Sequence, residues 1–257
     1  MKVFLLFIFI GIACTPSPAQ TRIHAHNDYQ KQEPLTNALR HQVFSIEADI
    51  YLSGNKLLVA HDRKELATAP TLDSLYLQPI IKLFSRHKGT IREGSSYSPV
   101  LMIDIKENGE AAIAQLIKIV SVYRAVFDRS INAGAVQLVI SGDRGASSTW
   151  TSYPPYILFD GRPNEVYDNA MLQRVAFISD SYSKYTDPQD SIRNQLGQAV
   201  KKVHSMGKLF RIWGSPDNAD SWKLQRQLGI DIINTDKVAE CRNYFTDNKE
   251  NNPASVN

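Results

Sequence analysis

The chain has 257 residues, of which 43% are hydrophobic and 21% charged, proportions typical of a globular protein that buries a sizeable core. Its formal net charge is only +3, from 29 basic and 26 acidic residues that are scattered along the chain. This weak and dispersed charge excludes the dense basic surface of a nucleic-acid-binding protein, and we expect no nucleic-acid partner.

The N-terminus has the pattern of an export signal. Lys2 is followed by an eleven-residue apolar run, residues 3–13, and then by small residues. Such a run is too short to cross a bilayer, which needs about 20 residues, but it suits the apolar part of a signal peptide. We predict a signal peptide over residues 1–19 with cleavage before Gln20. The alternative is a lipoprotein signal acylated at Cys14, and either version predicts an exported protein, periplasmic or secreted.

Beyond this segment, short strand-like runs alternate with helical ones. The predicted strands cover residues 22–26, 44–50, 100–105, 136–140, 156–159, 175–178, 209–213 and 230–233. The predicted helices cover residues 34–40, 72–87, 111–127, 165–172, 190–204, 221–228 and 238–245. Eight strands with mostly helical crossovers predict an α/β fold, a parallel (β/α)8 TIM barrel. We expect one barrel domain over residues 20–245, followed by a disordered polar tail over residues 246–257.

Three acidic residues lie near the ends of neighbouring predicted strands, where barrel enzymes place their chemistry. In the second strand, Glu47 and Asp49 are two residues apart and therefore share one face. Asp104 has the matching position in the third strand, and Lys106 shares its face. Carboxylates this close are unfavourable unless a cation offsets their charge. Because all three ligands are oxygens, we predict one divalent cation, Ca²⁺ or Mg²⁺.

Histidines in the same region suit proton transfer, because the unperturbed imidazole pKa is about 6.5. His24 and His26 share a face of the first strand, and His61 ends an extended run over residues 56–60. Two histidines on opposite sides of a phosphate, beside a cation, would serve as general acid and general base. The remaining histidines are expected to have surface roles: His41, His87 and His204.

The run from His24 to Asp62 resembles the opening of the glycerophosphodiester phosphodiesterase and phosphatidylinositol-phospholipase-C-like superfamily. Members of this superfamily open with a strand histidine, a proline, a helix, Glu-x-Asp and His-Asp. The corresponding residues here are His26, Pro34, Glu47, Asp49, His61 and Asp62. The interval from His26 to Pro34 favours His26 over His24 as the first motif histidine. Residues 229–237 resemble a late motif of the superfamily, and the His-Asn-Asp-Tyr opening at residues 26–29 resembles a bacterial branch.

This resemblance implies a metal-dependent phosphoric diester hydrolase that acts on a glycerophosphodiester or phospholipid-type substrate. It implies that His26 and His61 form the acid–base pair. Glycerophosphodiesterases usually carry an arginine after the first histidine, where this chain has Asn27. In the phospholipase C branch an asparagine at that place is a metal ligand, so Asn27 is expected to coordinate through its amide oxygen.

Without that arginine, phosphate binding is expected to fall to Lys106 and Arg211. Trp213 shares a face with Arg211 at the end of the seventh predicted strand and is expected at the rim of the site. The expected partner is a small-molecule or lipid-headgroup phosphodiester, with membrane contact only through an acyl group on Cys14.

Two other interpretations are compatible with the residues. A metal-dependent amidohydrolase, or a barrel of the polymerase-and-histidinol-phosphatase type, would use the His24-Ala25-His26 pair as ligands. Those families need further histidine ligands, and after residue 88 the chain has only His204. The second is a barrel that binds a phosphorylated ligand without cleaving it, which would not require both His26 and His61.

Overall fold

The computed structural model describes residues 21–187 and 190–247, in which eight parallel strands close into a barrel. The hydrogen-bonded order is β1-β9-β8-β7-β6-β5-β4-β2, and β1 also pairs with β2, which closes the ring. The barrel strands are β1 (Arg22–Ala25), β2 (Ser45–Ser53), β4 (Val100–Ile105), β5 (Gln137–Gly142), β6 (Ile157–Gly161), β7 (Val175–Ser181), β8 (Phe210–Trp213) and β9 (Ile232–Thr235). The predicted TIM barrel is therefore confirmed.

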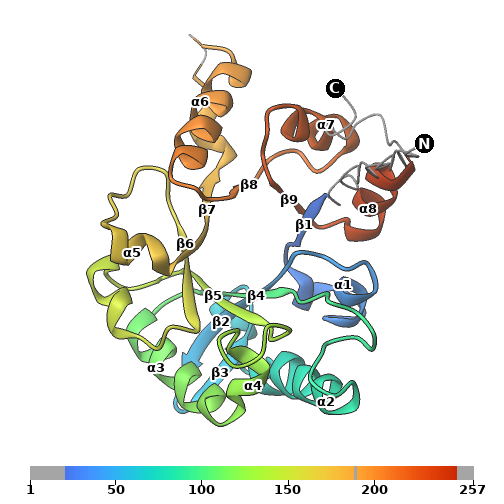
Figure 1. The fold of residues 1–257 in the computed structure, drawn as a ribbon, viewed down its shortest axis with the longest axis vertical. Helices are drawn as coiled ribbons and strands as arrows, with labels where there is room; N and C mark the ends of the chain where they lie inside the picture. The colour runs from blue at the N-terminus through green and yellow to red at the C-terminus, as the bar shows by residue number, and fades with distance from the viewer. Residues whose placement is uncertain (1–20, 188–189, 248–257) are drawn as a thin grey trace, which may run out of the picture.

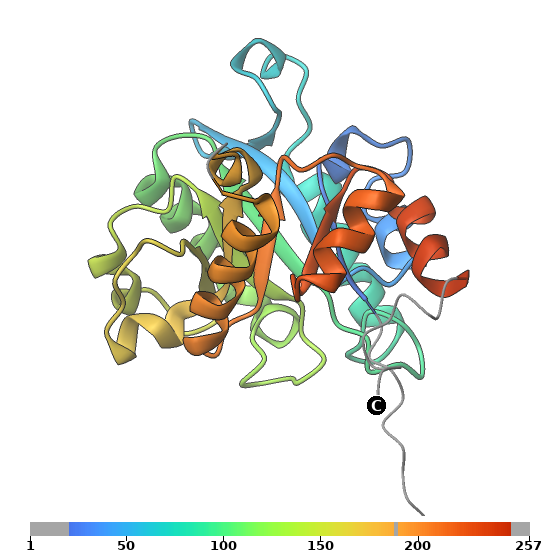
Figure 2. The ribbon, with the colours of Figure 1, turned by 90° about the horizontal axis from the view of Figure 1, so that it is seen from above.

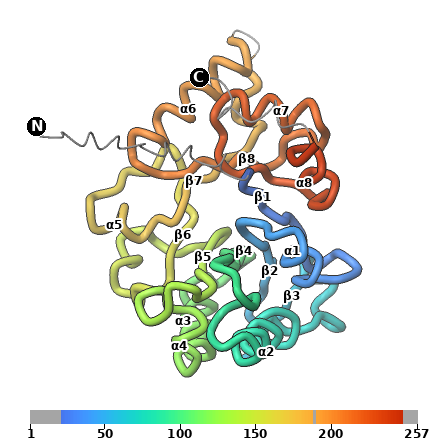
Figure 3. Tube along the Cα trace, turned by 45° about the vertical axis from the view of Figure 1, so that its right-hand side comes forward, coloured from blue at the N-terminus to red at the C-terminus, as the bar shows by residue number. Residues whose placement is uncertain are grey.

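Helices surround the strands on the outside, as Figures 1 and 3 both show. They are α1 (Thr36–Arg40), α2 (Gln78–Arg86), α3 (Gly109–Val120), α4 (Arg124–Phe127), α5 (Asn169–Arg174), α6 (Ile192–Ser205), α7 (Ala219–Gln227) and α8 (Val238–Asp247). In Figure 1 the blue strand β1 lies beside the red strand β9, so the two ends of the described chain meet where the ring closes. None of the helices within the described ranges is both long and apolar enough to span a bilayer.

Side-chain alternation divides the core into two layers. Outward-facing strand residues such as Ile46, Ala48 and Ile50 join the large cluster between the strands and the helices. The interior of the barrel is filled by a separate apolar cluster: Val100, Met102, Val139, Phe177 and Ile232. Because Asp104 has the same parity as Val100 and Met102, its side chain continues this interior row toward the carboxyl end of β4.

Several predicted elements have different boundaries or shapes. The extended run at residues 56–60 is a ninth strand, β3 (Lys56–Val59), which pairs antiparallel with β2 as a hairpin rather than joining the ring. The segment between β3 and α2 projects beyond the barrel in Figure 2. The predicted helix at residues 165–172 begins only at Asn169, because the side chain of Asp168 caps it by accepting from the Met171 N–H at 2.8 Å.

The two other long predicted helices are interrupted. Residues 72–87 start with a π-helical turn, Asp73–Leu77, before α2, and residues 111–127 break at a 3₁₀ turn, Ser121–Tyr123, between α3 and α4. At the C-terminus, α8 continues to Asp247, two residues past the predicted end of the barrel domain at residue 245. The rest of the predicted tail, the predicted signal peptide over residues 1–19 and Cys14 lie outside the described residues.

Candidate active site

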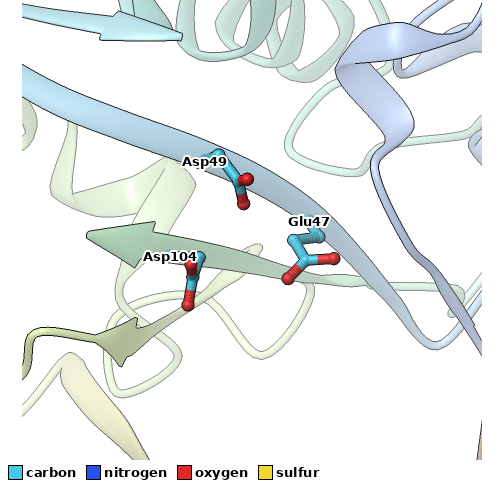
Figure 4. Close-up of side chains that lie close together, drawn as sticks. All are labelled: Glu47, Asp49 and Asp104. Carbon is cyan, nitrogen blue, oxygen red and sulfur yellow. The ribbon is translucent and has the colours of Figure 1, made fainter. Parts of the chain in front are cut away.

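Three carboxylates converge at the carboxyl ends of β2 and β4. Glu47 and Asp49 come from β2, and Asp104 comes from β4, where it lies level with Asp49 in the parallel register. Figure 4 shows the three side chains directed into the same space. Each offers an oxygen within 4.8 Å of the others, so the cluster could hold a metal ion. The three acidic residues that strand parity places on one face in the sequence thus lie together in the structure.

Lys106 partly offsets this negative charge. Its Nζ lies 2.6 Å from Oδ2 of Asp49 and 2.7 Å from Oδ2 of Asp104. Burial lowers the pKa of Lys106, but the two carboxylates outweigh that effect and raise it above the usual value. Burial raises the pKa of Asp104, and Lys106 reverses only part of that shift. Lys106 therefore offsets the charge of Asp49 and Asp104 only in part.

His26 lies directly beyond β1 and is one-third exposed. Its Nδ1 is 3.3 Å from Oδ1 of Asp236, and its Nε2 is 3.7 Å from Oε2 of Glu47. Burial lowers the pKa of His26, but the hydrogen bond to Asp236 and the charges of Glu47 and Asp236 together raise it above the usual value. In return, the hydrogen bond from His26 lowers the pKa of Asp236 to about 2. The pair therefore favours a protonated ring beside an ionised carboxylate.

His24 has a different environment from His26, although the sequence predicts that both lie on one face of the first strand. The ring is fully buried, with Nδ1 2.7 Å from Oγ of Ser45 and Nε2 3.3 Å from Oε2 of Glu47. Burial, and then the charge of Arg211, lower the pKa of His24 to about 4. The neutral, fully buried His24 ring hydrogen-bonds Glu47 from inside the barrel and cannot contact a ligand.

His61 reaches the cluster from the hairpin. β3 returns antiparallel along β2, and the Ala60 N–H donates to the backbone oxygen of Asp49 at 3.1 Å. The His61 N–H is held by Oε2 of Glu65 at 2.9 Å. The half-exposed ring places Nδ1 2.9 Å from Oδ2 of Asp49. As with His26, a carboxylate takes Nδ1 and leaves Nε2 for other partners.

Asn27 and Tyr29 link the two histidines. Asn27 has a left-handed backbone, φ 48°, and its N–H donates to Oε2 of Glu47 at 3.3 Å. Its Nδ2 lies 3.0 Å from Nδ1 of His26, while its Oδ1 lies 3.2 Å from the Tyr29 hydroxyl oxygen. That hydroxyl donates to Oδ2 of Asp49 at 2.8 Å. Asn27 thus lies at the cluster, where its amide oxygen already has one partner.

Tyr29 is a site residue that the sequence analysis missed. Besides its bond to Asp49, its hydroxyl lies 3.2 Å from Nδ1 of His61. Burial, and then the charge of Asp49, raise the pKa of Tyr29 well above its usual value, so the phenol stays protonated and donates. The available signal was its place in the His-Asn-Asp-Tyr run, three residues after His26.

A cavity of about 300 Å³ opens in front of the cluster. It is lined by His26, Glu47, Asp104, Lys106, Ser141, Gly142, Arg162, Arg211 and Trp213. Trp213 is 41% exposed, as expected for a residue at the rim, whereas Arg211 is only 3% exposed. Arg162 was not predicted at the site, because it lies in a loop with no periodic sequence pattern.

Comparison with known proteins agrees with this architecture. The model of the AIM6-like phosphodiesterase domain matches residues 15–144, which is 130 of the 257 residues. The chain belongs to this family. Among curated members of similar sequence, Altered inheritance of mitochondria protein 6 of Eremothecium gossypii is 28% identical over 270 residues, covering 86% of this chain and 68% of that protein. The Arthroderma benhamiae homolog is 25% identical over 265 residues, covering 87% of this chain and 83% of the homolog.

Solved structures with a similar fold include two glycerophosphodiester phosphodiesterases. The protein from Parabacteroides distasonis has a TM-score of 0.61 at 14% identity, covering 90% of this chain and 100% of that chain. The protein from Agrobacterium tumefaciens has a TM-score of 0.53 at 14% identity, covering 87% of this chain and 99% of that chain. At such identity the likeness shows the fold. The expected bacterial branch is not confirmed.

The comparisons correct the predicted localisation. The AIM6 relatives carry a name that refers to the inheritance of mitochondria, and nothing in these comparisons indicates a signal peptide or export. The prediction of a periplasmic, secreted or lipid-anchored protein is therefore wrong. It rested on the apolar run at residues 3–13, and an apolar run of that length is not specific to export signals.

Proposed function

We propose that the protein is a metal-dependent phosphodiester hydrolase that acts on a glycerophosphodiester or phospholipid-type substrate. The observation that carries this proposal is the matched pair of histidines around the carboxylate cluster. Nδ1 of His26 lies 3.3 Å from Asp236, and Nδ1 of His61 lies 2.9 Å from Asp49. Each carboxylate orients its ring and leaves Nε2 as the nitrogen that exchanges a proton with the substrate.

The two rings have complementary tasks in such a reaction. One accepts the proton of the attacking hydroxyl, and the other gives a proton to the leaving alcohol. Each transfer contributes about 10²- to 10⁴-fold to the rate. Tyr29 steadies His61 and Asp49 through its hydroxyl, while His24 fixes the position of Glu47 from inside the barrel.

The donor set fits a hard divalent cation. Glu47, Asp49 and Asp104 supply oxygens within 4.8 Å of one another, and the amide oxygen of Asn27 lies 3.2 Å from the Tyr29 hydroxyl that contacts Asp49. When bound, Ca²⁺ or Mg²⁺ offsets charge on the phosphate and lowers the pKa of an attacking hydroxyl. Lys106 holds Asp49 and Asp104 in place and adds a fixed positive charge at the cavity wall.

The amidohydrolase interpretation has no comparable support. It requires several histidine ligands, and within residues 21–187 and 190–247 the group of potential ligands is the three-carboxylate cluster. His24, the first histidine of the His-x-His pair, is fully buried against Ser45 and Glu47. A barrel that binds a phosphorylated ligand without cleaving it stays as an outcome of the test below.

The test is a phosphorus NMR time course on the full chain. The substrates are a mixture of glycerophosphodiesters, lysophospholipid and phosphatidylinositol, first with Ca²⁺ or Mg²⁺ and then with a chelator. We expect loss of one diester signal that requires the cation. If no diester is consumed while calorimetry shows the cation bound, the protein is a binding protein and the proposal fails.

Histidine variants connect the activity to the site. His26→Ala and His61→Ala should each lower turnover by at least roughly 100-fold, because each removes one proton transfer. His204→Ala is the matched control, since that ring lies on α6 and pairs with Asp231 at 2.8 Å. Near-normal turnover in either cluster variant would exclude the acid–base roles.

A further inference from the structure

The wall of the cavity opposite the histidine–carboxylate side carries an arginine. In the eight-strand ring β6 is diametrically opposite β1, and Arg162 follows β6 directly, as His26 follows β1. Both residues line the same cavity of about 300 Å³. Any ligand that lies between them therefore has Arg162 on the side away from His26.

Within the described part of the chain, the guanidinium of Arg162 is fixed through one nitrogen. Its Nη1 lies 2.9 Å from Oδ2 of Asp160 and donates to the backbone oxygens of Asp160 at 3.2 Å and Gly161 at 2.8 Å. Among the described residues, Nε and Nη2 of this side chain have no hydrogen-bond partner, and the side chain is 20% exposed. The Nε–Nη2 edge is the one that binds two oxygens of a phosphate or carboxylate at once.

Asp160 fixes the position of the Arg162 guanidinium. Its side chain is fully buried and accepts hydrogen bonds from Ser179 at 2.6 Å and Ser141 at 3.0 Å. With both oxygens engaged, the carboxylate cannot rotate away from Arg162. The arginine is thus positioned before any ligand arrives, which reduces the entropy lost on binding.

Arg211, which the sequence analysis proposed for phosphate binding, is engaged on all sides. Its Nε donates to Ser179 at 2.9 Å, its Nη1 donates to Asn234 at 2.9 Å, and its Nη2 lies 3.5 Å from Asp160. Only 3% of the residue is exposed. A ligand would have to break these buried contacts to bind Arg211, whereas Nε and Nη2 of Arg162 have no partner among the residues that the structure describes.

We propose that Arg162 is the anion-binding residue of the cavity, and that Asp160 is its positioning residue. The ligand chemistry is a pair of anionic oxygens held by the Nε–Nη2 edge. The identity of these oxygens rests on the proposed function. They belong either to the phosphodiester itself or to a second anionic group on the alcohol that it carries. In either case Arg162 takes the place of the arginine that is missing at Asn27.

The first arm of the test measures binding of inorganic phosphate by calorimetry, with Mg²⁺ present, and needs no turnover. We expect Arg162→Gln to raise the Kd roughly 10- to 100-fold, as for loss of a charge-assisted bidentate contact. Arg162→Lys should recover part of the lost phosphate affinity, because lysine keeps the positive charge but cannot donate two parallel hydrogen bonds as the guanidinium does. Arg92→Gln is the control, since Arg92 lines a separate groove beside α1 and α2. A Kd for Arg162→Gln within twofold of wild type, or no phosphate binding by wild type, would overturn the inference.

The second arm measures KM and kcat for diesters with a neutral alcohol and for diesters with an anionic alcohol. If Arg162→Gln raises KM for both, the anion is the diester phosphate; if only for the second kind, it is the additional group. Unchanged KM and kcat for both would reject the inference and leave the proposed function standing. Phosphate binding that depends on Arg162 in a protein that consumes no diester would reject the proposed function and keep the anion site.

Discussion

Replacing Asp160 by asparagine tests whether the charges inside the barrel stabilise the fold. The carboxylate is fully buried and faces Arg162 at 2.9 Å and Arg211 at 3.5 Å. Removing one partner of a buried ion pair costs about 3–5 kcal/mol, because the other charge is left uncompensated. Arg211 is only 3% exposed, whereas the Arg162 side chain is 20% exposed and can hydrate through the cavity, so we expect a value near the lower limit. About 3 kcal/mol is a large part of the 5–15 kcal/mol that stabilises a typical domain.

The assay is urea unfolding at pH 7, followed by tryptophan fluorescence, with the free energy of unfolding taken from the midpoint and slope. Asp128→Asn is the matched control. Asp128 is also buried and lies 2.6 Å from Arg124, but that arginine is 48% exposed and can rehydrate, so a loss of roughly 1 kcal/mol is expected. A loss below roughly 1 kcal/mol for Asp160→Asn, or equal losses for the two variants, would refute the argument from burial.

The difference in unfolding free energy between wild type and Asp160→Asn should also depend on pH. Burial raises the pKa of Asp160, but the charges of Arg162 and Arg211 outweigh it and lower the pKa below the ordinary value of about 4. The stabilisation is therefore complete above the pKa of the unfolded chain and is lost as the pH falls through the folded-state pKa. The gap in unfolding free energy between wild type and Asp160→Asn should narrow below about pH 4. A gap that widens in acid would contradict the sign.

Two further substitutions test the site. Tyr29→Phe removes the hydrogen-bond donor to Asp49. We expect turnover in steady-state kinetics to fall roughly tenfold and the free energy of unfolding to change by about 1 kcal/mol; an unchanged kcat would exclude a positioning role for Tyr29. Gly142 has φ +68°, and a Cβ added there would lie 2.9 Å from Oδ1 of Asp104. We therefore expect Gly142→Ala to lower the free energy of unfolding in urea by more than about 2 kcal/mol and to weaken Mg²⁺ binding in calorimetry. Gly54→Ala, at φ +57° with no atom within 4 Å, is the control for φ alone; equal effects of the two glycine variants on Mg²⁺ affinity would refute the crowding argument.

Much of the carboxylate cluster could be predicted because strand parity is a local property. Alternation along β2 separates Glu47 and Asp49 from the outward-facing apolar residues, and the same rule applies to Asp104 in β4. In a parallel barrel the ends of neighbouring strands lie at one height, so the three residues had to meet. No long-range information was needed beyond the closure of the sheet.

Partners that come from loops could not be predicted in this way. Tyr29, Arg162 and Asp236 each follow a strand, in segments whose backbone is set by turn geometry rather than by a period. Asp236 reaches His26 across 210 residues of sequence, because β9 closes the ring against β1. Such contacts depend on how the barrel closes. The His-Asn-Asp-Tyr run marks Tyr29 and the late motif at residues 229–237 marks Asp236, but neither motif predicts which side chain the residue contacts.

Strand parity predicts which face a side chain lies on but not how deep it lies in the barrel, which explains why Arg211 is buried and Trp213 is exposed. Both lie on the same face of β8, two residues apart, and the sequence analysis placed both at the site. Two residues along a strand correspond to a rise of about 7 Å, enough to separate the interior of the barrel from its mouth. Arg211 is accordingly 3% exposed within the Asp160 network, and Trp213 is 41% exposed at the rim. Both side chains line the cavity, but a ligand can reach Trp213 without breaking the buried contacts that hold Arg211.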